Sequence, residues 1–311
     1  MLKRIGGGGV RLDGIHHISA ITADAPANVD FYTRVLGLRL VARTVNQDDP
    51  RHHHLFYADE EGRPGSELTF FEYRGLPPGR AGSGMVHRIE WRVAAPEALD
   101  FWGERLGDEG LAAERDGEGL LFADPEGLGH RLVVDDSDPP LRARHPAIPA
   151  EMALGGFAGV RAYSRAPERS GALLADVMGA TPAGPGAWEV RGPRRGAVIA
   201  LDPPPAERTL RGAGTVHHVA WATTAHDHPR WHRRLREAGV RSTDVIDRYY
   251  FHALYFREPS GVLYEIADDV PGFTRDLPVA ELGTRLVLPP WLEDRRDEIA
   301  AGLTPLPAAG P

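Results

Sequence analysis

Short apolar runs recur along the chain, and each is followed by a segment that begins near a proline and ends at a glycine. The runs have the length and composition of β-strands. Proline in the first turn and glycine just past the last turn are the usual marks of helix ends, so the segments between them predict helices. The predicted strands are residues 15–21, 86–93, 157–163 and 216–222. The predicted helices are residues 26–37, 96–107, 167–179 and 229–239.

This order of elements repeats four times. After each predicted helix come further strand-like segments, and the last of them follows a related turn that ends in glycine. The turns are residues 58–62, 123–127, 192–196 and 257–261. An internal repeat indicates architecture more firmly than local propensity does, so we predict an α+β fold built from four βαβββ modules. The alternative is an ordinary α+β protein whose spacing is coincidental.

The modules divide the chain into two pairs. The N-terminal pair is predicted over residues 10–136 and the C-terminal pair over residues 156–270. Residues 137–155 lie in a stretch rich in proline and charge, which predicts a linker. Residues 271–311 predict a tail with one helix around residues 293–303.

Composition narrows the classes of function. The chain has 42% hydrophobic residues but no long uninterrupted apolar run, and residues 1–10 lack the apolar core of a signal peptide. We therefore expect a cytoplasmic protein with no membrane partner. The formal net charge of -8 argues against nucleic acid as a partner, because phosphate binding needs a basic face. The chain contains no cysteine, so histidine, aspartate or glutamate must hold any metal.

A pair of adjacent histidines opens both the first and the fourth module: His16-His17 and His217-His218. Residues alternate between the faces of a strand, so both members of a pair are unlikely to bind one metal, and the alternation does not say which one faces inward. Glu265 interrupts an apolar strand of the fourth module, where an unpaired buried charge would be costly. Two imidazoles and a carboxylate predict a metal site, with an ion pair to Arg248 or Arg257 as the alternative for Glu265.

Several phrases resemble the vicinal oxygen chelate superfamily, which includes glyoxalase I, fosfomycin-resistance proteins and extradiol ring-cleaving dioxygenases. Within it, the chain is most similar to the ring-cleaving dioxygenases of the hydroquinone 1,2-dioxygenase type. These phrases span nearly the whole chain and include residues 14–18, 30–37, 55–59, 64–65, 216–220, 247–248, 255–265, 271–274 and 282–283.

The resemblance implies how the chain folds and what it binds. It implies that the modules pair into two curved mixed β-sheet cups, and it places metal ligands at His17, His218 and Glu265. It places four further residues around the substrate: His16, His217, Arg248 and Tyr255. It further implies iron, a small aromatic substrate with dioxygen as partners, and the option of a homodimer. The residues alone favour a solvated cation for Arg248 and a core aromatic for Tyr255, and it is the resemblance that reverses this interpretation.

Comparison of the four modules locates the special positions independently. The position of His17 is taken by Arg88, Gly159 and His218 in the other modules. The position of Glu265 is taken by Thr69 in the first module, Arg131 or Leu132 in the second and Ala200 in the third. We therefore expect the first and fourth modules to share a metal-bearing cup. Threonine is a poor ligand, so three protein ligands are expected, although a small register error would bring Glu67 or Glu72 into the fourth position.

Three protein ligands on an octahedral metal leave one face open, as non-haem Fe(II) oxygenases require. The same donors also suit Mn(II) or Zn(II). The leading hypothesis is an Fe(II)-dependent extradiol-type dioxygenase acting on a hydroquinone-like or catecholic ring. The alternatives are a glyoxalase-like metal-dependent isomerase or lyase, and a stress protein that binds quinones without turnover.

Two further groups of histidines are expected to lie outside the site. Of His52, His53 and His54, only His54 is expected near the ligands, with the other two in solvent. The second group, predicted to lie at the surface, contains His226, His228 and His232.

Overall fold

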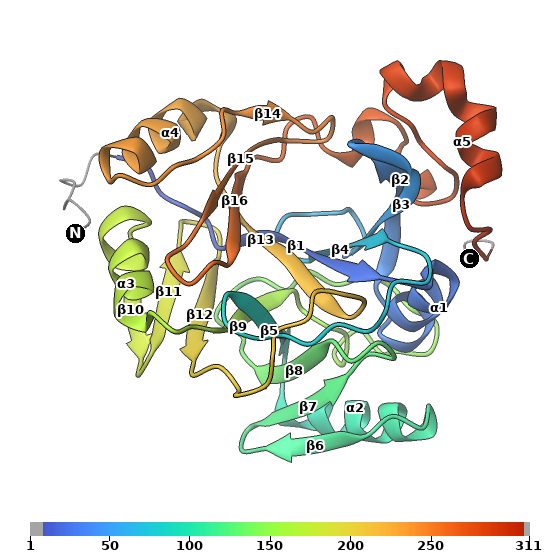
Figure 1. Ribbon diagram of the computed structural model, residues 1–311. Helices are drawn as coiled ribbons and strands as arrows, with labels where there is room; N and C mark the ends of the chain where they lie inside the picture. Colours follow the sequence, from blue (N-terminus) through green and yellow to red (C-terminus); the bar gives the residue numbers. More distant parts are fainter. Residues whose placement is uncertain (1–8, 308–311) are drawn as a thin grey trace.

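The computed structural model describes residues 9–307 as two mixed β-sheets of eight strands each, flanked by short helices (Figure 1). The expectation that no signal peptide is present falls mainly on residues 1–8, and the end of the predicted tail falls on residues 308–311; both ranges lie outside the described residues. Within the described chain, no helix combines the length and the apolar character needed to cross a membrane.

The first sheet combines the first and fourth modules. Its strands, in spatial order, are β14 (Ile246–Asp247), β15 (His252–Arg257), β16 (Leu263–Ala267), β13 (Thr215–Ala222), β1 (Ile15–Thr22), β4 (Glu67–Glu72), β3 (Asp49–Ala58) and β2 (Arg39–Asn46). The central strands β1 and β13 run antiparallel, and each pairs in parallel with the last strand of its own module. The strands therefore follow the βαβββ pattern, and the sheet joins the two ends of the chain.

The second sheet combines the second and third modules in the same way. Its strands, in spatial order, are β10 (Thr181–Gly184), β11 (Ala187–Arg191), β12 (Gly196–Asp202), β9 (Phe157–Tyr163), β5 (Met85–Val93), β8 (Gly129–Val134), β7 (Gly119–Ala123) and β6 (Ala113–Asp116). The α+β fold with two mixed sheets of βαβββ modules is thus confirmed. Each sheet takes one module from each half of the chain, so the division into an N-terminal and a C-terminal pair describes the sequence rather than the sheets.

Each module contributes one helical segment near the predicted place. The helices are α1 (Ala25–Asp30), α2 (Pro96–Asp108), α3 (Pro167–Ala172) and α4 (His228–Glu237). All four carry proline in the first turn, as the sequence predicts. Two of them continue into a π-helical turn, Phe31–Val35 after α1 and Leu173–Val177 after α3. Gly37 follows the first of these with φ 68°, a left-handed conformation that favours glycine.

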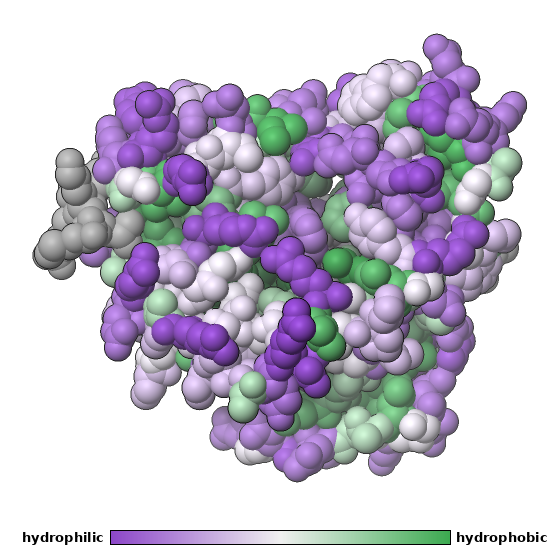
Figure 2. Space-filling view, viewed as in Figure 1, coloured by the Kyte–Doolittle hydropathy of each residue, from purple (hydrophilic) through white to green (hydrophobic). Residues whose placement is uncertain are grey.

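Four tryptophans anchor the core: Trp91, Trp102, Trp221 and Trp231 are fully buried. Removing roughly 200 Å² of each ring system from water is worth about 5 kcal/mol at 25 cal/mol per Å². The surface seen in Figure 2 is mainly hydrophilic, with apolar residues showing between the polar ones. This distribution is the one expected for a chain with a large internal core.

The tail packs against the edge of the first sheet. It contains α5 (Arg296–Gly302), preceded by a 3-10 turn at Pro290–Arg295, close to the helix predicted from the sequence. Leu288, Leu292 and Ile299 form a small cluster with Val45 of β2. The tail therefore covers β2 and β3, the strands that form one wall of the first sheet (Figure 1).

Candidate metal centre

Three predicted ligands converge on the concave side of the first sheet. Nε2 of His17 lies 3.1 Å from Nε2 of His218. Oε2 of Glu265 lies 3.4 Å from the first nitrogen and 2.9 Å from the second. All three side chains are buried. Residues separated by about 200 positions in the chain thus present three donor atoms to one point.

The donor spacing fits a divalent metal. Two donors held at right angles about 2.1 Å from a metal lie about 3.0 Å apart, so the three observed separations match three neighbouring corners of an octahedron. Although Glu265 is this close to His218, neither carboxylate oxygen has a hydrogen-bond partner within residues 9–307. Lone pairs that are buried without a donor are what a metal ligand requires.

Strand register explains how the ligands meet. Ser19 pairs with His218 across the β1–β13 seam, and Ala220 pairs with Glu265 across β13–β16. A register shift between Ile15 and Ile18 places a bulge at His16-His17, which changes the simple alternation of faces there. The direction of His17 therefore depends on this local irregularity, which sequence periodicity does not reveal.

The first histidine of each pair contacts the ring of the second, which is the predicted ligand. Nδ1 of His17 lies 3.0 Å from Nδ1 of His16, and Nδ1 of His218 lies 2.7 Å from Nδ1 of His217. If Nε2 of each ligand keeps its lone pair for a metal, its Nδ1 carries the proton and donates to the neighbouring imidazole. Burial lowers the pKa of both His16 and His217 to about 3, so both are neutral acceptors at pH 7.

The two supporting histidines differ in access. His16 is buried behind His17, its ring 5.5 Å from that of Phe251, and it does not line the cavity beside the ligands. His217 lines the cavity and is exposed to solvent. The structure thus brings both predicted residues next to a ligand, but only His217 can touch a molecule in the cavity.

Glu265 is paired with the histidines and not with an arginine. Burial alone would raise the pKa of Glu265, but His17 and His218 lower it well below its ordinary value. Arg257 instead binds the carbonyl oxygen of Gly261, and Arg248 binds Tyr255 and Asp48. The ion-pair alternative considered for Glu265 is therefore wrong.

Glu67 forms a second group of potential donors with His16 and His17. Its Oε2 lies 3.8 Å from Nδ1 of His16, but Glu67 does not line the cavity. Burial raises the pKa of Glu67 well above its ordinary value, which disfavours the charged form of its carboxyl group. A carboxyl group whose charged form is disfavoured by burial, and which is closed off from the cavity, is the weaker candidate for a metal ligand.

The fourth-ligand position holds a hydroxyl group. Ser19 pairs with Thr69 as Ala220 pairs with Glu265, so Thr69 stands where the sequence comparison places it. Oγ1 of Thr69 lies 2.7 Å from Oγ of Ser19 and 3.0 Å from Nε2 of His54. Two side chains of the protein thus hold this hydroxyl group, and threonine is a poor metal ligand, which leaves three protein donors at the centre.

A cavity of about 320 Å³ opens beside the three ligands. Its walls combine aromatic rings with a few polar groups, among them Phe56, Phe71, Phe251, His54, His217, Arg248 and Tyr255. Tyr255 lies opposite Glu265 in the β15–β16 pair, and its hydroxyl oxygen accepts a hydrogen bond from Nε of Arg248 at 3.3 Å. Arg248 also pairs with Asp48 at 3.2 Å, which links the β2–β3 hairpin to the segment before β15.

Two wall residues carry signals that the sequence reading missed or undervalued. Phe251 packs against the rings of both His16 and His17, although it lies in an irregular segment after Tyr249, which has φ 71°. His54 packs between Phe56 and Phe71, with both ring-centroid separations at 4.0 Å. His54 and Phe56 are two residues apart in a strand and therefore share one face, which was the sequence signal that places His54 at the cavity.

Two predictions about peripheral histidines are wrong. His53 is buried, and its Nε2 lies 2.8 Å from the carbonyl oxygen of Thr304 in the tail. His228 is buried at the start of α4, 3.3 Å from Asp268. Both histidines are covered by segments that are distant in the sequence, so the neighbouring residues alone predicted exposed side chains.

Comparisons with known proteins agree with this architecture. The model of the Glyoxalase/Bleomycin resistance protein/Dioxygenase superfamily matches residues 14–130 and 94–266. The chain is 39% identical over 326 residues to MhqA of Bacillus subtilis (strain 168), which is named provisionally as a ring-cleaving dioxygenase; the match covers 96% of this chain and 100% of MhqA. It is 30% identical over 309 residues to the chlorohydroquinone/hydroquinone 1,2-dioxygenase of Sphingobium indicum, covering 93% and 95% of the two chains.

A solved structure shows the same fold over nearly the full length. The crystal structure of a provisionally named dioxygenase from Bacillus subtilis superposes with a TM-score of 0.90 at 37% identity, covering 96% of this chain and 99% of that one.

Proposed function

Since the chain belongs to the glyoxalase/bleomycin resistance protein/dioxygenase superfamily, we propose that it is an Fe(II)-dependent extradiol-type dioxygenase that opens the ring of hydroquinone-like or catecholic aromatics. The observation that carries the proposal is the set of three buried donors, His17, His218 and Glu265, spaced as neighbouring corners of an octahedron beside an aromatic-walled cavity. A ferrous ion held there would supply the redox chemistry that joins dioxygen to the ring.

Arg248 and Tyr255 are the groups placed to stabilise negative charge. The guanidinium group of Arg248 stands at the cavity wall and favours the phenolate form of a bound substrate. Burial, with Glu265 nearby, raises the pKa of Tyr255, so its hydroxyl group keeps its proton at pH 7. That oxygen accepts from Arg248, and its proton, which lies within hydrogen-bonding reach of the Glu265 carboxylate, would turn to an oxygen anion that develops during the reaction.

His217 and His54 are placed to recognise hydroxyl groups through hydrogen bonds. If Nδ1 of His217 accepts from His218, its Nε2–H group is left to face the cavity. Nε2 of His54 is tied to Thr69, so Nδ1 is its free polar atom. We assign to His54 the hydroxyl group remote from the metal, the feature that separates a para-hydroquinone from a catechol, while Phe56 and Phe71 hold its ring flat against the cavity.

Oxygen uptake after anaerobic reconstitution with Fe(II) tests the proposal. Hydroquinones and catechols are supplied in parallel, and Mn(II) and Zn(II) loadings serve as controls because the same donors accept them. Uptake that depends on Fe(II) and on one substrate class is expected. No uptake with either class would refute the proposal, and turnover under nitrogen would favour the isomerase or lyase alternative. Tight binding without a product would favour a quinone-binding protein.

A cytoplasmic location and a homodimer stay predictions from sequence and family likeness. Both are tested by fractionation and by the mass of the purified protein in solution.

A further inference from the structure

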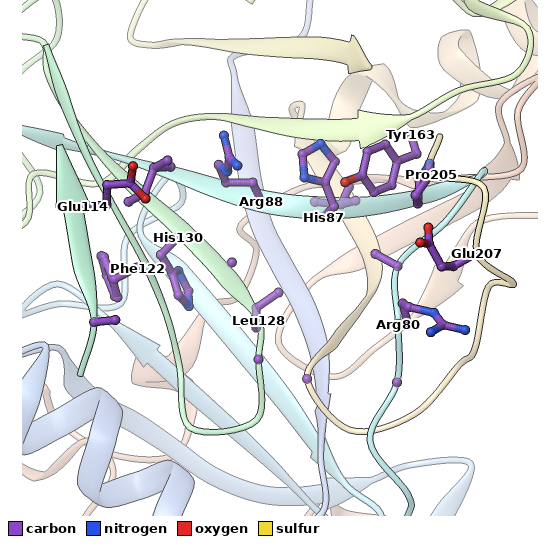
Figure 3. Close-up of a pocket in the computed structure, with 18 of the residues that line it drawn as sticks. Arg80, His87, Arg88, Glu114, Phe122, Leu128, His130, Tyr163, Pro205 and Glu207 are labelled. Carbon is purple, nitrogen blue, oxygen red and sulfur yellow. The ribbon is translucent and has the colours of Figure 1, made fainter. Parts of the chain in front are cut away.

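The second sheet carries a larger cavity than the metal centre, of about 640 Å³, at the rim of its concave side. Figure 3 shows its labelled side chains: His87 and Arg88 project from β5, with Tyr163 beside His87, Glu114 beyond Arg88, and Arg80 and Glu207 on the loops opposite. Nothing in the proposed reaction uses these residues.

One wall residue of this cavity, Arg88, lies at the counterpart of a ligand position in the metal centre. Glu90 pairs with Gly159 across β5–β9 as Ser19 pairs with His218 across β1–β13. By this register, Arg88 occupies the place of the ligand His17, and both β5 and β1 have a register shift at this point. The second sheet thus offers a fixed organic cation where the first offers a ligand for a metal cation.

Arg88 is the cation that the second sheet leaves without a counterion. Arg131 pairs with Glu90 at 3.4 Å, and Arg161 pairs with Asp202 at 2.6 Å. Arg88 is half-buried and has neither a hydrogen bond nor an ion pair within residues 9–307. A half-buried guanidinium group with five free donors favours a carboxylate, which it can bind through two parallel hydrogen bonds.

The shape and charge of the walls limit the anion further. The rings of His87 and Tyr163 stack on each other at 3.9 Å with an angle of 14°, and Nε2 of His87 lies 2.8 Å from Asp202, so the two rings form one rigid aromatic stack at this wall. Glu114 and Glu207 also line the cavity and would repel a second negative charge. Arg80 lies opposite, where it binds the carbonyl oxygen of Arg208.

We propose that this cavity binds a planar, conjugated monocarboxylate, with the carboxylate on Arg88 and the flat part of the molecule against His87 and Tyr163. The chemistry is shared by aromatic acids and by open-chain conjugated acids. The proposal stands independently of the reaction assigned to the metal centre, since it uses none of its residues.

Calorimetric titration of the metal-loaded protein tests the proposal with benzoate as the aromatic probe and sorbate as the open-chain probe. Cyclohexanecarboxylate, which is not planar, and phthalate, which carries two charges, are the matched controls. Benzoate or sorbate is expected to bind at least tenfold more tightly than either control. Tighter binding of benzoate would indicate an aromatic acid as the ligand, and tighter binding of sorbate an open-chain conjugated acid. Equal affinity for all four compounds, or no heat with any of them at millimolar concentration, would overturn the proposal.

Variants locate the binding. Arg88→Gln is expected to weaken the binding at least tenfold and Arg88→Lys less, while Tyr163→Leu should erase the preference for planar acids. Glu265→Gln separates this cavity from the metal centre, because benzoate bound to a metal would be lost in that variant and kept in Arg88→Gln. Binding that survives Arg88→Gln unchanged refutes the assignment. Circular dichroism shows whether each variant is folded, and the probe series on the unaltered protein decides the ligand class should one of them fail to fold.

Discussion

Replacing Glu265 by glutamine separates the metal centre from an ordinary buried polar cluster. The side chain is fully buried, and its Oε2 lies 2.9 Å from Nε2 of His218 and 3.4 Å from Nε2 of His17. Glutamine keeps the shape but removes the charge that a divalent ion needs. We therefore expect Glu265→Gln to fold and to lose the thermal stabilisation that metal gives the unaltered protein.

The size of that loss follows from linkage. An ion present at a thousand times its dissociation constant stabilises the folded state by about 4 kcal/mol. For a chain of this length, 1 kcal/mol moves the melting temperature by about 2 °C, so the expected shift on adding metal is about 8 °C. Scanning calorimetry under nitrogen, with and without Mn(II) or Fe(II), measures it. The unaltered protein should show the shift, and Glu265→Gln should show almost none.

Glu67→Gln is the matched control. Glu67 is equally enclosed and stands beside His16 and His17, the other group of donors that could hold a metal. Burial raises the pKa of Glu67 and disfavours its charged form, and an amide is close to an isosteric replacement for its carboxyl group. Glu67→Gln should keep the shift. If it abolishes the shift while Glu265→Gln keeps it, the ion sits in the other group and the assignment of ligands is wrong.

Three further outcomes test the surroundings of the site. Arg248→Gln should lower kcat about 100-fold, as expected when one donor to a developing anion is removed, with metal content unchanged; loss of metal would contradict its role. His54→Phe should raise KM for hydroquinone at least tenfold but leave catechol unaffected, and equal effects on both would remove the assignment of His54 to the remote hydroxyl group. Burial lowers the pKa of His130 to about 3, so between that pH and about 6.5 the unfolded chain binds a proton that the folded chain does not, and stability falls with acid by up to about 1.4 kcal/mol per pH unit. Urea unfolding at several pH values from 6.5 to 4.5 measures how the free energy of unfolding changes with pH. This change should be smaller for His130→Gln than for the unaltered protein, and an equal change in both would contradict the role of His130.

The sequence was sufficient for features that repeat. The pairing of the first module with the fourth followed from the histidine pairs, and the position of Thr69 followed from counting residues from each turn glycine. The structure shows the same register, because four modules of one design share their strand pairings. Repetition converts an uncertain local pattern into several independent observations of the same position.

Features that arise from irregular backbone or distant contacts were not predictable. The bulge at His16-His17 decides which ring faces the cavity, and Phe251 reaches those rings from a segment without regular structure. His53 and His228 were wrongly predicted to lie in solvent. Each is covered by a residue far away in the chain, Thr304 for His53 and Asp268 for His228, so the local sequence does not show the burial. Burial of a polar residue by a distant segment leaves no pattern in the neighbouring sequence.

The way the two sheets are assembled links catalysis to stability. His17 and His218 are 201 residues apart, so an ion that joined them would close a long loop and restrict the unfolded chain, as a cross-link does. The second sheet has the same seam between distant modules, but its concave side is held by pairs such as Arg161 with Asp202, which are partly exposed and individually worth at most about 1 kcal/mol. The first sheet must also keep a cavity open beside its ligands, which removes packing that the core would otherwise supply. A bound metal would therefore offset in the first sheet the stability that an open site costs, whereas the second sheet, whose cavity is larger, relies on its ion pairs and leaves Arg88 without one within residues 9–307.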